Sequence, residues 1–266
     1  MNPLKHLAKR LLYAPPGKKD CVFPYFGAQA HFPAGAHVVL RAFEEGIFQE
    51  DLVQRICHAL RPDSWFFDIG ANLGLMSLPV LHFVKGSHVV SFEPSPHALP
   101  YLQRTCQEAT AYQGRWNVVG KALAAQSGQA DFYTAGGENS AFDGLANTGR
   151  EGGRQKVTVA VSTVDAEWEA LGKPAVTVVK MDVEGGELAV LQGATAFLAV
   201  CRPVIFCEWN AGNLAAHRCA EDSLFHWAQT AHYQVCSLPS LTPVLTPDHL
   251  RMCMRMSEEF VLLPKI

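Results

Sequence analysis

Three patterns that would each point to a particular class of protein are missing from these 266 residues. No basic stripe follows the first twenty residues and the net charge is −3, so nothing supplies the phosphate contacts of a nucleic-acid-binding protein. No apolar run approaches the ~18 residues of a membrane-spanning helix. No G-x-x-x-x-G-K-[ST] sequence occurs, which excludes a P-loop nucleotide site. Neither nucleic acid nor a transmembrane segment is therefore expected.

Cysteine is present, but without a framework. The eight cysteines are scattered along the chain and none forms a C-x-x-C pair. Disulfide frameworks and zinc sites usually show close, paired spacing. We therefore predict reduced, mostly buried thiols and a cytoplasmic location.

The N-terminus carries an ambiguous pattern. Over residues 1–12, leucines at helical spacing alternate with basic side chains. This pattern fits a small amphipathic helix at an anionic membrane surface, although a terminal helix packed on its own domain, or a frayed one, is favoured. The apolar stretch is too short for a signal peptide. A linker that can include a hairpin follows at residues 15–36, and the spacing is helical from Val38 to Leu60. We expect residues 1–60 to form an N-terminal helix, linker and cap.

From residue 64 onward, short apolar runs alternate with segments of helical length. Continuous apolar runs are typical of strands covered on both faces, as in parallel α/β sheets. The expected strands are Trp65–Ile69, Val89–Phe92, Val118–Leu123, Val176–Met181, Val204–Cys207, Tyr233–Leu238 and Phe260–Leu263, with Ala130–Tyr133 and Lys156–Val161 as additions. Residues 61–266 therefore predict an α/β domain with a Rossmann-like, doubly wound, mostly parallel sheet. The last two strands lack a clear connecting helix, which predicts an antiparallel strand at one edge.

The sharpest motif is FFDIGANLG at residues 66–74, followed by SFEPSP at residues 91–96. An apolar strand ends at Asp68 and turns through Gly70, Asn72 and Gly74 into a helix, and glycines there let a ligand approach the backbone closely. Glu93 ends the next strand, 19 residues beyond Gly74. A carboxylate at this place can accept both hydroxyl protons of a ribose. The spacing therefore predicts a ribose-containing cofactor.

The charge in this motif favours one cofactor over another. A dinucleotide site needs a bare G-x-G-x-x-G turn facing a pyrophosphate, whereas here a carboxylate opens the turn. Asp68 would repel a pyrophosphate and attract the cationic amino and sulfonium groups of S-adenosylmethionine (SAM). An NAD(P)-dependent oxidoreductase on the same sheet remains the alternative, together with a catalytically silent SAM-binding module.

The combination of DIGANLG, FEPSP, VVKMDVEGGELAVLQGA (178–194) and PVIFCEW (203–209) resembles the FkbM-type SAM-dependent methyltransferases over residues 46–209. The resemblance implies a class I methyltransferase fold and methylation of hydroxyl groups, often on sugars or other small molecules. It also implies a cofactor site, in which Pro94 and Ser95 flank the adenine and Glu93 holds the ribose. The methionine part is assigned to the turn residues Asp68, Gly70, Ala71, Asn72 and Gly74.

Removal of a hydroxyl proton requires a base, since a sugar hydroxyl is a very weak acid. Asp182 and Glu184 follow one strand and Glu208 closes the next, so all three are candidate catalytic residues at the lip of the crevice. Glu187 is expected to begin the following helix, where a carboxylate favours the helix dipole. Asp182 and Glu208 could also hold a divalent metal, but the sequence offers no third convincing ligand, and no metal is predicted. His217, His226 and His232 are further candidate bases.

Taken together, the sequence predicts a SAM-dependent O-methyltransferase acting on a small-molecule or carbohydrate acceptor. The acceptor itself cannot be inferred, because acceptor pockets are built from variable loops. The segments at 136–153 and 239–257 are the expected acceptor loops.

Overall fold

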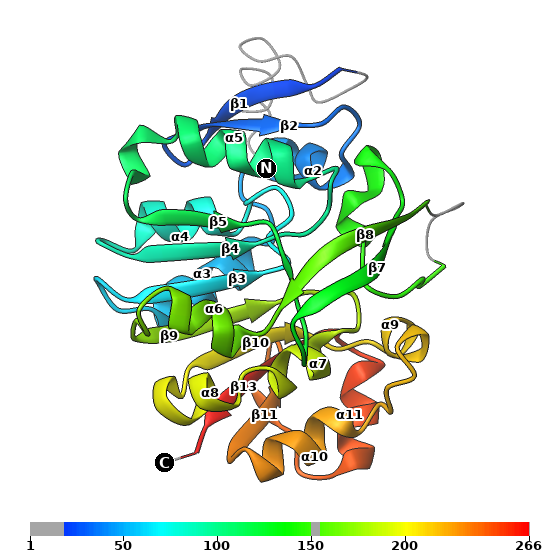
Figure 1. The fold of residues 1–266 in the computed structure, drawn as a ribbon. Coiled ribbons are helices and arrows are strands. Elements are labelled where there is room, and N and C mark those ends of the chain that lie inside the picture. Colours follow the sequence, from blue (N-terminus) through cyan, green and yellow to red (C-terminus); the bar gives the residue numbers. More distant parts are fainter. Residues whose placement is uncertain (1–18, 150–154, 266) are drawn as a thin grey trace.

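The computed structural model describes residues 19–149 and 155–265, so the amphipathic segment predicted at residues 1–12 lies outside the described residues. Its largest feature is an eight-stranded sheet (Figure 1). The strands of this sheet are β3 (Trp65–Ile69), β4 (His88–Phe92), β5 (Trp116–Val119), β9 (Val176–Met181), β10 (Val204–Glu208), β11 (Tyr233–Ser237), β12 (Thr242–Pro243) and β13 (Glu259–Pro264).

The strand order is β12-β11-β13-β10-β9-β3-β4-β5. Strands β10, β9, β3, β4 and β5 run parallel, and β13 pairs antiparallel with both β10 and β11. The predicted antiparallel pairing near one edge is confirmed: β13 lies between β10 and β11 and runs antiparallel to both, and only β11 and β12 lie beyond it. From β3 the chain builds outward to β4 and β5, and later places β9 and β10 on the other side of β3. The topological switch point therefore lies between β3 and β9, where α/β sheets bind ligands at the carboxyl ends of their strands.

Helices cover both faces of this sheet. They are α2 (His37–Glu45), α3 (Glu50–Ala59), α4 (Ser77–Phe83), α5 (Leu99–Glu108), α6 (Val164–Ala170), α7 (Glu187–Gln192), α8 (Thr195–Cys201), α9 (Ala211–Ala216), α10 (Ser223–Thr230) and α11 (Pro247–Met254), with 3₁₀ turns at Thr110–Tyr112 and Gly137–Phe142. None of the helices in the described ranges combines the length and apolarity needed to cross a bilayer.

The apolar runs are continuous because each strand has a core on both sides. Neighbouring strand residues point to opposite faces, and Phe66 and Phe67 accordingly belong to two different buried clusters. Val178 and Val179 divide in the same way. One cluster joins the sheet to α2–α5, and the other joins it to α6–α11. Each fully buried side chain of this size contributes about 1.5–3 kcal/mol through removal from water.

The N-terminal segment packs onto the first of these clusters. Strands β1 (Cys21–Tyr25) and β2 (Ala28–Phe32) form an antiparallel hairpin that turns at Phe26 and Gly27. Phe23 and Phe32 share a buried cluster with Phe66 of β3. The hairpin allowed for by the sequence is confirmed, while the domain boundary at residue 60 stays a prediction.

A second, three-stranded sheet crosses beside the first (Figure 1). It contains β6 (Ala122–Leu123), β8 (Gln155–Ser162) and β7 (Gly128–Thr134), in that order. The run Val118–Leu123, expected as one strand, is divided between the two sheets. It breaks at Gly120 and Lys121, where a Cβ on Gly120 would lie 2.7 Å from Leu99 Cδ2 and where Lys121 Nζ lies 2.7 Å from Glu167 Oε1.

Candidate active site

The turn that follows β3 brings the chain against the end of β9. Gly70 has a φ of +75°, and a Cβ at this position would lie 1.9 Å from the carbonyl oxygen of Asp182. Only glycine combines this left-handed backbone with so close an approach. The first glycine of the motif therefore allows the ends of β3 and β9 to pack closely together, and it adds no side chain to the cavity beside them.

Gly70→Ala is expected to lower the free energy of unfolding by about 2–4 kcal/mol, because the methyl group adds a clash to the cost of a positive φ. Gly172→Ala is the matched control: its φ is +81°, but a Cβ there has nothing within 4 Å. Chemical denaturation of both variants separates the two contributions. Equal losses would show that the approach to Asp182 is unimportant.

Glu93, at the end of β4, is held by the same turn. The backbone N–H of Asn72 donates to Glu93 Oε2 at 2.7 Å, and that of Ser95 donates to Oε1 at 2.7 Å. Burial raises the pKa of Glu93 to about 7, although these two amides favour the ionised form. The carboxylate is thus fixed in orientation and titrates near neutrality.

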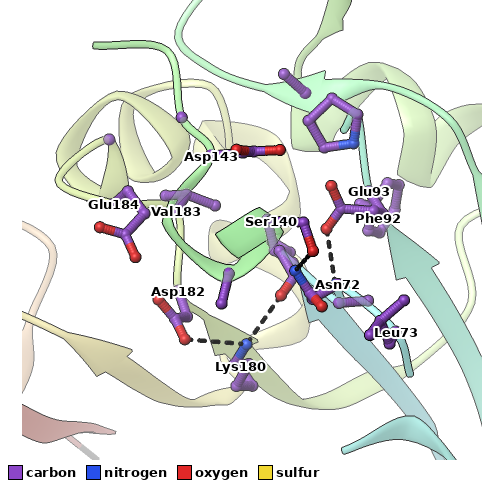
Figure 2. A pocket seen from close by; sticks show the side chains of 18 of the residues that line it. Asn72, Leu73, Phe92, Glu93, Ser140, Asp143, Lys180, Asp182, Val183 and Glu184 are labelled. Atoms are coloured by element: carbon purple, nitrogen blue, oxygen red, sulfur yellow. Dashed lines mark hydrogen bonds and ion pairs between the residues drawn. The ribbon is translucent and has the colours of Figure 1, made fainter. Parts of the chain in front are cut away.

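Glu93 and Asn72 line a cavity at the switch point (Figure 2). Asp182 and Glu184 lie on one side of it and Glu93 on the other. Four acidic and two basic side chains line the cavity among the described residues: Glu93, Asp143, Asp182, Glu184, Lys121 and Lys180. Its net negative charge favours a cationic ligand over a pyrophosphate.

Lys180 lies at the base of this cavity, and its ammonium group lies close to two carboxylates. Its Nζ donates to the carbonyl oxygen of Gly70 at 3.1 Å and lies 3.7 Å from Asp68 Oδ1 and 3.6 Å from Asp182 Oδ2. Burial opposes the charge, but the nearby carboxylates, Asp182 and Asp68 first among them, outweigh it and raise the pKa of Lys180. A buried cation therefore holds the ends of β3 and β9 together.

Asp68 lies beneath the cavity and does not line it. Its side chain is fully buried, and Ser77 Oγ donates to its Oδ2 at 2.6 Å. Burial raises the pKa of Asp68, whereas Lys180 and Ser77 act in the opposite direction. In this structure the charge of Asp68 faces Lys180 Nζ, 3.7 Å away, and a direct contact of Asp68 with a cofactor stays a prediction.

The turn after β9 returns Glu184 to the strand end. Strand alternation stops at Met181, and Glu184 has a φ of +56°. Glu187 begins α7, as predicted, and its buried Oε1 accepts from the N–H groups of Val183 at 2.9 Å and Gly185 at 3.4 Å. Burial raises the pKa of Glu187 to about 7. Glu187 therefore holds the turn that presents Glu184.

Three carboxylates meet where β9 and β10 end. One oxygen from each of Asp182, Glu184 and Glu208 lies within 4.8 Å of the others. Burial, with the charges of Asp182 and Glu184, raises the pKa of Glu208 to about 9. Oxygen ligands at this spacing can hold a divalent cation. The sequence offers no convincing third ligand beside Asp182 and Glu208, and the folded turn places Glu184 in that position.

A comparison with known families decides the class of this site. The model of the methyltransferase FkbM domain matches residues 68–258. The chain belongs to the FkbM methyltransferase family. Its sheet, with antiparallel β13 between β10 and β11, is the class I methyltransferase fold that was predicted.

Solved structures similar to this FkbM methyltransferase share little sequence with it. A methyltransferase FkbM from Methylobacillus flagellatus KT is 18% identical over 85% of this chain and 52% of that chain, with a TM-score of 0.47, so this chain spans about half of its length. A precorrin-6y C5,15-methyltransferase from Geobacter metallireducens GS-15 is 13% identical over 71% and 72% of the two chains, with a TM-score of 0.43. Cofactor-bound Rv0187 from MTB is 13% identical over 80% and 78%, with a TM-score of 0.45. No curated protein matches the chain significantly.

Five of the predicted cofactor residues of the FkbM methyltransferase line the cavity. They are Gly70, Ala71, Asn72, Glu93 and Pro94. Asp68, Gly74 and Ser95 lie outside the lining. A Cβ on Gly74 would lie 2.8 Å from Leu102 Cδ1, and Ser95 Oγ donates to Asp143 Oδ2 at 2.6 Å. Gly74 therefore serves helix packing, and Ser95 anchors a loop that covers the cavity.

Other lining residues were not found from the sequence. Val38, Phe48 and Gln49 reach the cavity from the N-terminal segment, and Asp143 reaches it from the loop after β7. No local pattern marks them, because the contact arises only when the cap and the loop fold over the sheet. The part of the predicted loop at 136–153 that lines the cofactor-side cavity lies between Ser140 and Leu145.

Of the candidate histidines, only His217 lies close to the three carboxylates. It packs against the Glu184–Gly185 turn, and burial lowers the pKa of its ring. His226 and His232 are exposed. None of the three lines the cavity among the described residues.

Proposed function

We propose that this FkbM methyltransferase is a SAM-dependent O-methyltransferase that moves a methyl group to a hydroxyl of a small-molecule or carbohydrate acceptor. The observation that carries the proposal is the cavity at the switch point, with Glu93 on one side and Asp182 on the other. The carboxylate of Glu93 can accept hydrogen bonds from ribose hydroxyls, and the carboxylate of Asp182 can accept the proton of a reacting hydroxyl.

The lining fits SAM in three respects. Gly70 leaves the strand ends bare, and the net charge of the lining is negative. The buried Oδ1 of Asn72 has no hydrogen-bond partner in the described part of the chain, so it is available to accept from the amino group of the methionine part. When bound, SAM supplies an electrophilic methyl group on a positively charged sulfur.

The protein's own tasks are then alignment and proton transfer. Asp182 borders both this cavity and a second one that contains Glu208. Its carboxylate would take up the proton that the acceptor hydroxyl loses when the methyl group passes from sulfur to oxygen. Glu208, whose pKa is about 9, holds a proton at neutral pH and is the second candidate. Glu184 is the third carboxylate of the cluster that Asp182 and Glu208 form.

The proposal is tested by calorimetry with SAM, S-adenosylhomocysteine and NADH, followed by labelled methyl transfer from SAM into a cell extract with mass spectrometry of the labelled product. We expect SAM to bind and the label to appear in a methyl ether formed at a hydroxyl of the acceptor. Binding without any transfer would favour a silent SAM-binding module. Binding of NADH alone would favour the oxidoreductase alternative and contradict the family assignment.

Cofactor affinity is expected to fall as the pH drops through about 7. Glu93 must be ionised to accept two ribose hydroxyls, so protonation removes an acceptor. Between about pH 8 and pH 6, the Kd of S-adenosylhomocysteine should rise roughly tenfold. Glu93→Gln should bind more weakly and show a flat profile. A wild-type profile that is equally flat would remove Glu93 from the ribose site.

The compartment and partners complete the proposal. The eight cysteines are unpaired, which supports a reducing compartment such as the cytoplasm. We expect no nucleic-acid partner, since the cavity and the whole chain carry net negative charge.

A further inference from the structure

A compact loop forms one wall of the cofactor cavity. It runs from Gly136, whose φ is +93°, to Gly144, which pairs with Tyr133 of β7 through backbone hydrogen bonds of 2.8 and 3.1 Å. A Cβ on Gly136 would meet no other described atom within 4 Å. Ser140 and Asp143 line the cavity from this loop (Figure 2). The two ends of the 136–144 loop therefore lie beside β7, and its middle faces the cofactor site.

Asp143 connects this loop to the residues that follow β4. Ser95 Oγ donates to its Oδ2 at 2.6 Å, and the backbone N–H of Ala135 donates to its Oδ1 at 2.7 Å. The first bond joins the loop to the eight-stranded sheet, and the second joins it to the end of β7. Asp143 and Ser95 are both buried. Because a carboxylate accepts it, the bond from Ser95 belongs to the strong, charge-assisted kind.

The loop is held by the same two residues that hold the proposed ribose carboxylate. The backbone N–H groups of Asn72 and Ser95 both donate to Glu93. The side chains of these two residues donate to the loop, Asn72 Nδ2 to Ser140 Oγ at 3.4 Å and Ser95 Oγ to Asp143. The position of the loop and the position of the Glu93 carboxylate are therefore set by one group of hydrogen bonds.

We propose that Asp143 is a positioning residue of the cofactor site, which fastens the 136–144 loop over the bound nucleoside through its hydrogen bond with Ser95. The inference rests on the proposed function, because it requires SAM in this cavity. A ribose held by Glu93 steadies the two residues that hold the loop, and the fastened loop in turn retains the ribose. Release requires the bond from Ser95 to break, so its loss speeds dissociation more than it changes association.

Asp143 has a second effect on the site, which is electrostatic. Burial is the main cause of the raised pKa of Glu93, and the charge of Asp143 adds to it, whereas the two backbone amides and Lys180 oppose it. Removal of the charge of Asp143 therefore keeps Glu93 ionised to lower pH. The rate of release thus reports the hydrogen bond of Asp143, and the pH at which cofactor affinity falls reports its charge.

The test separates the hydrogen bond from the charge. Tritiated S-adenosylhomocysteine is bound to the full chain, and its dissociation is followed after addition of excess unlabelled compound. Ser95→Ala removes the bond and keeps the charge, so release should be about tenfold faster or more, with the pH midpoint of binding in place. Asp143→Asn removes the charge and keeps hydrogen-bonding groups of the same shape, so the midpoint should move to lower pH. Asp143→Ala should show both effects.

Two further variants control the comparison. Asp131→Asn removes an exposed carboxylate from β7 of the same hairpin, and it should change neither quantity. Ser95→Ala/Asp143→Ala should release the ligand no faster than Asp143→Ala alone, because both substitutions remove one shared bond. Should Ser95→Ala fail to fold, Asp143→Ala carries the comparison of release rates from the loop side.

Contrary results identify what is wrong. Release at the wild-type rate from Ser95→Ala and Asp143→Ala would overturn the proposal, and so would a loss of affinity that arises wholly from slower association. A midpoint that Asp143→Asn leaves in place would equally contradict it, because the loop would then not bring Asp143 against Glu93. If the wild-type chain binds no S-adenosylhomocysteine, the proposed function itself fails, and this inference fails with it.

Discussion

Lys180→Met is expected to lower the free energy of unfolding by about 3–5 kcal/mol, the cost of leaving buried charge without its partner. Asp68 is fully buried, and Lys180 Nζ is the cation placed 3.7 Å from it. Methionine preserves much of the length of the side chain but neither its charge nor its hydrogen bond to Gly70. Chemical denaturation at neutral pH measures the loss.

Two controls test the cause. Lys173→Met removes an exposed cation that pairs with Glu169, and surface pairs contribute only about 0–1 kcal/mol. Adding Asp68→Asn to Lys180→Met should recover part of the loss, because the orphaned charge is gone. The deficit of Lys180→Met should also shrink as pH falls. Burial raises the pKa of Asp68, so this carboxyl destabilises the fold as pH rises and takes up a proton in acid. A deficit that is independent of pH would point to lost packing instead.

Asp182→Asn and Glu208→Gln are expected to reduce turnover by about 10²–10⁴-fold where the altered group takes the hydroxyl proton. The Kd of S-adenosylhomocysteine should change little in either variant, since Glu93 and the Gly70 turn are untouched. Single-turnover methyl transfer and calorimetry measure the two quantities separately. Glu221→Gln, on a half-buried acid near Arg251, controls for the loss of one charge.

The pH profile distinguishes the two candidate bases. Burial and neighbouring acids raise the pKa of Glu208 to about 9, so a rate that depends on its ionised form should increase with pH through that value. A rate without this increase indicates Asp182. Full activity in both variants would move the search to His217, which lies against the turn that holds Glu184.

Much of the sheet could be predicted because its signals are local. Trp65–Ile69 and Val176–Met181 were predicted with the bounds that the structure has. Each is a mainly apolar run with a core on both faces, and its polar residues are Asp68 in the first and Thr177 and Lys180 in the second. The run Val118–Leu123 was predicted as one strand, whereas the structure divides it between β5 and β6 at Gly120, which packs against Leu99; apolarity along the chain does not reveal this contact.

The sequence predicted which residue types form the site, but it predicted less well which residues they contact. The motif spacing brought Gly70, Asn72 and Glu93 together around one cavity, as expected. It did not indicate that Asp68 faces Lys180 rather than the cavity, nor that Glu184 joins Asp182 and Glu208. Those outcomes depend on the direction of each side chain at a strand end and on a turn with a positive φ.

Read as a string of residues, this chain was sufficient to identify an α/β sheet, the FkbM methyltransferase family and the carboxylates near its strand ends, because apolar runs and short motifs act within a few neighbouring positions. Folding was needed to show which carboxylates line the cavity and which lie in the interior beside a buried cation. Lys180 meets the turn at Gly70, 110 positions away, only once β3 and β9 pair. Charges so far apart along the chain acquire their partners, their burial and hence their pKa values only through that pairing.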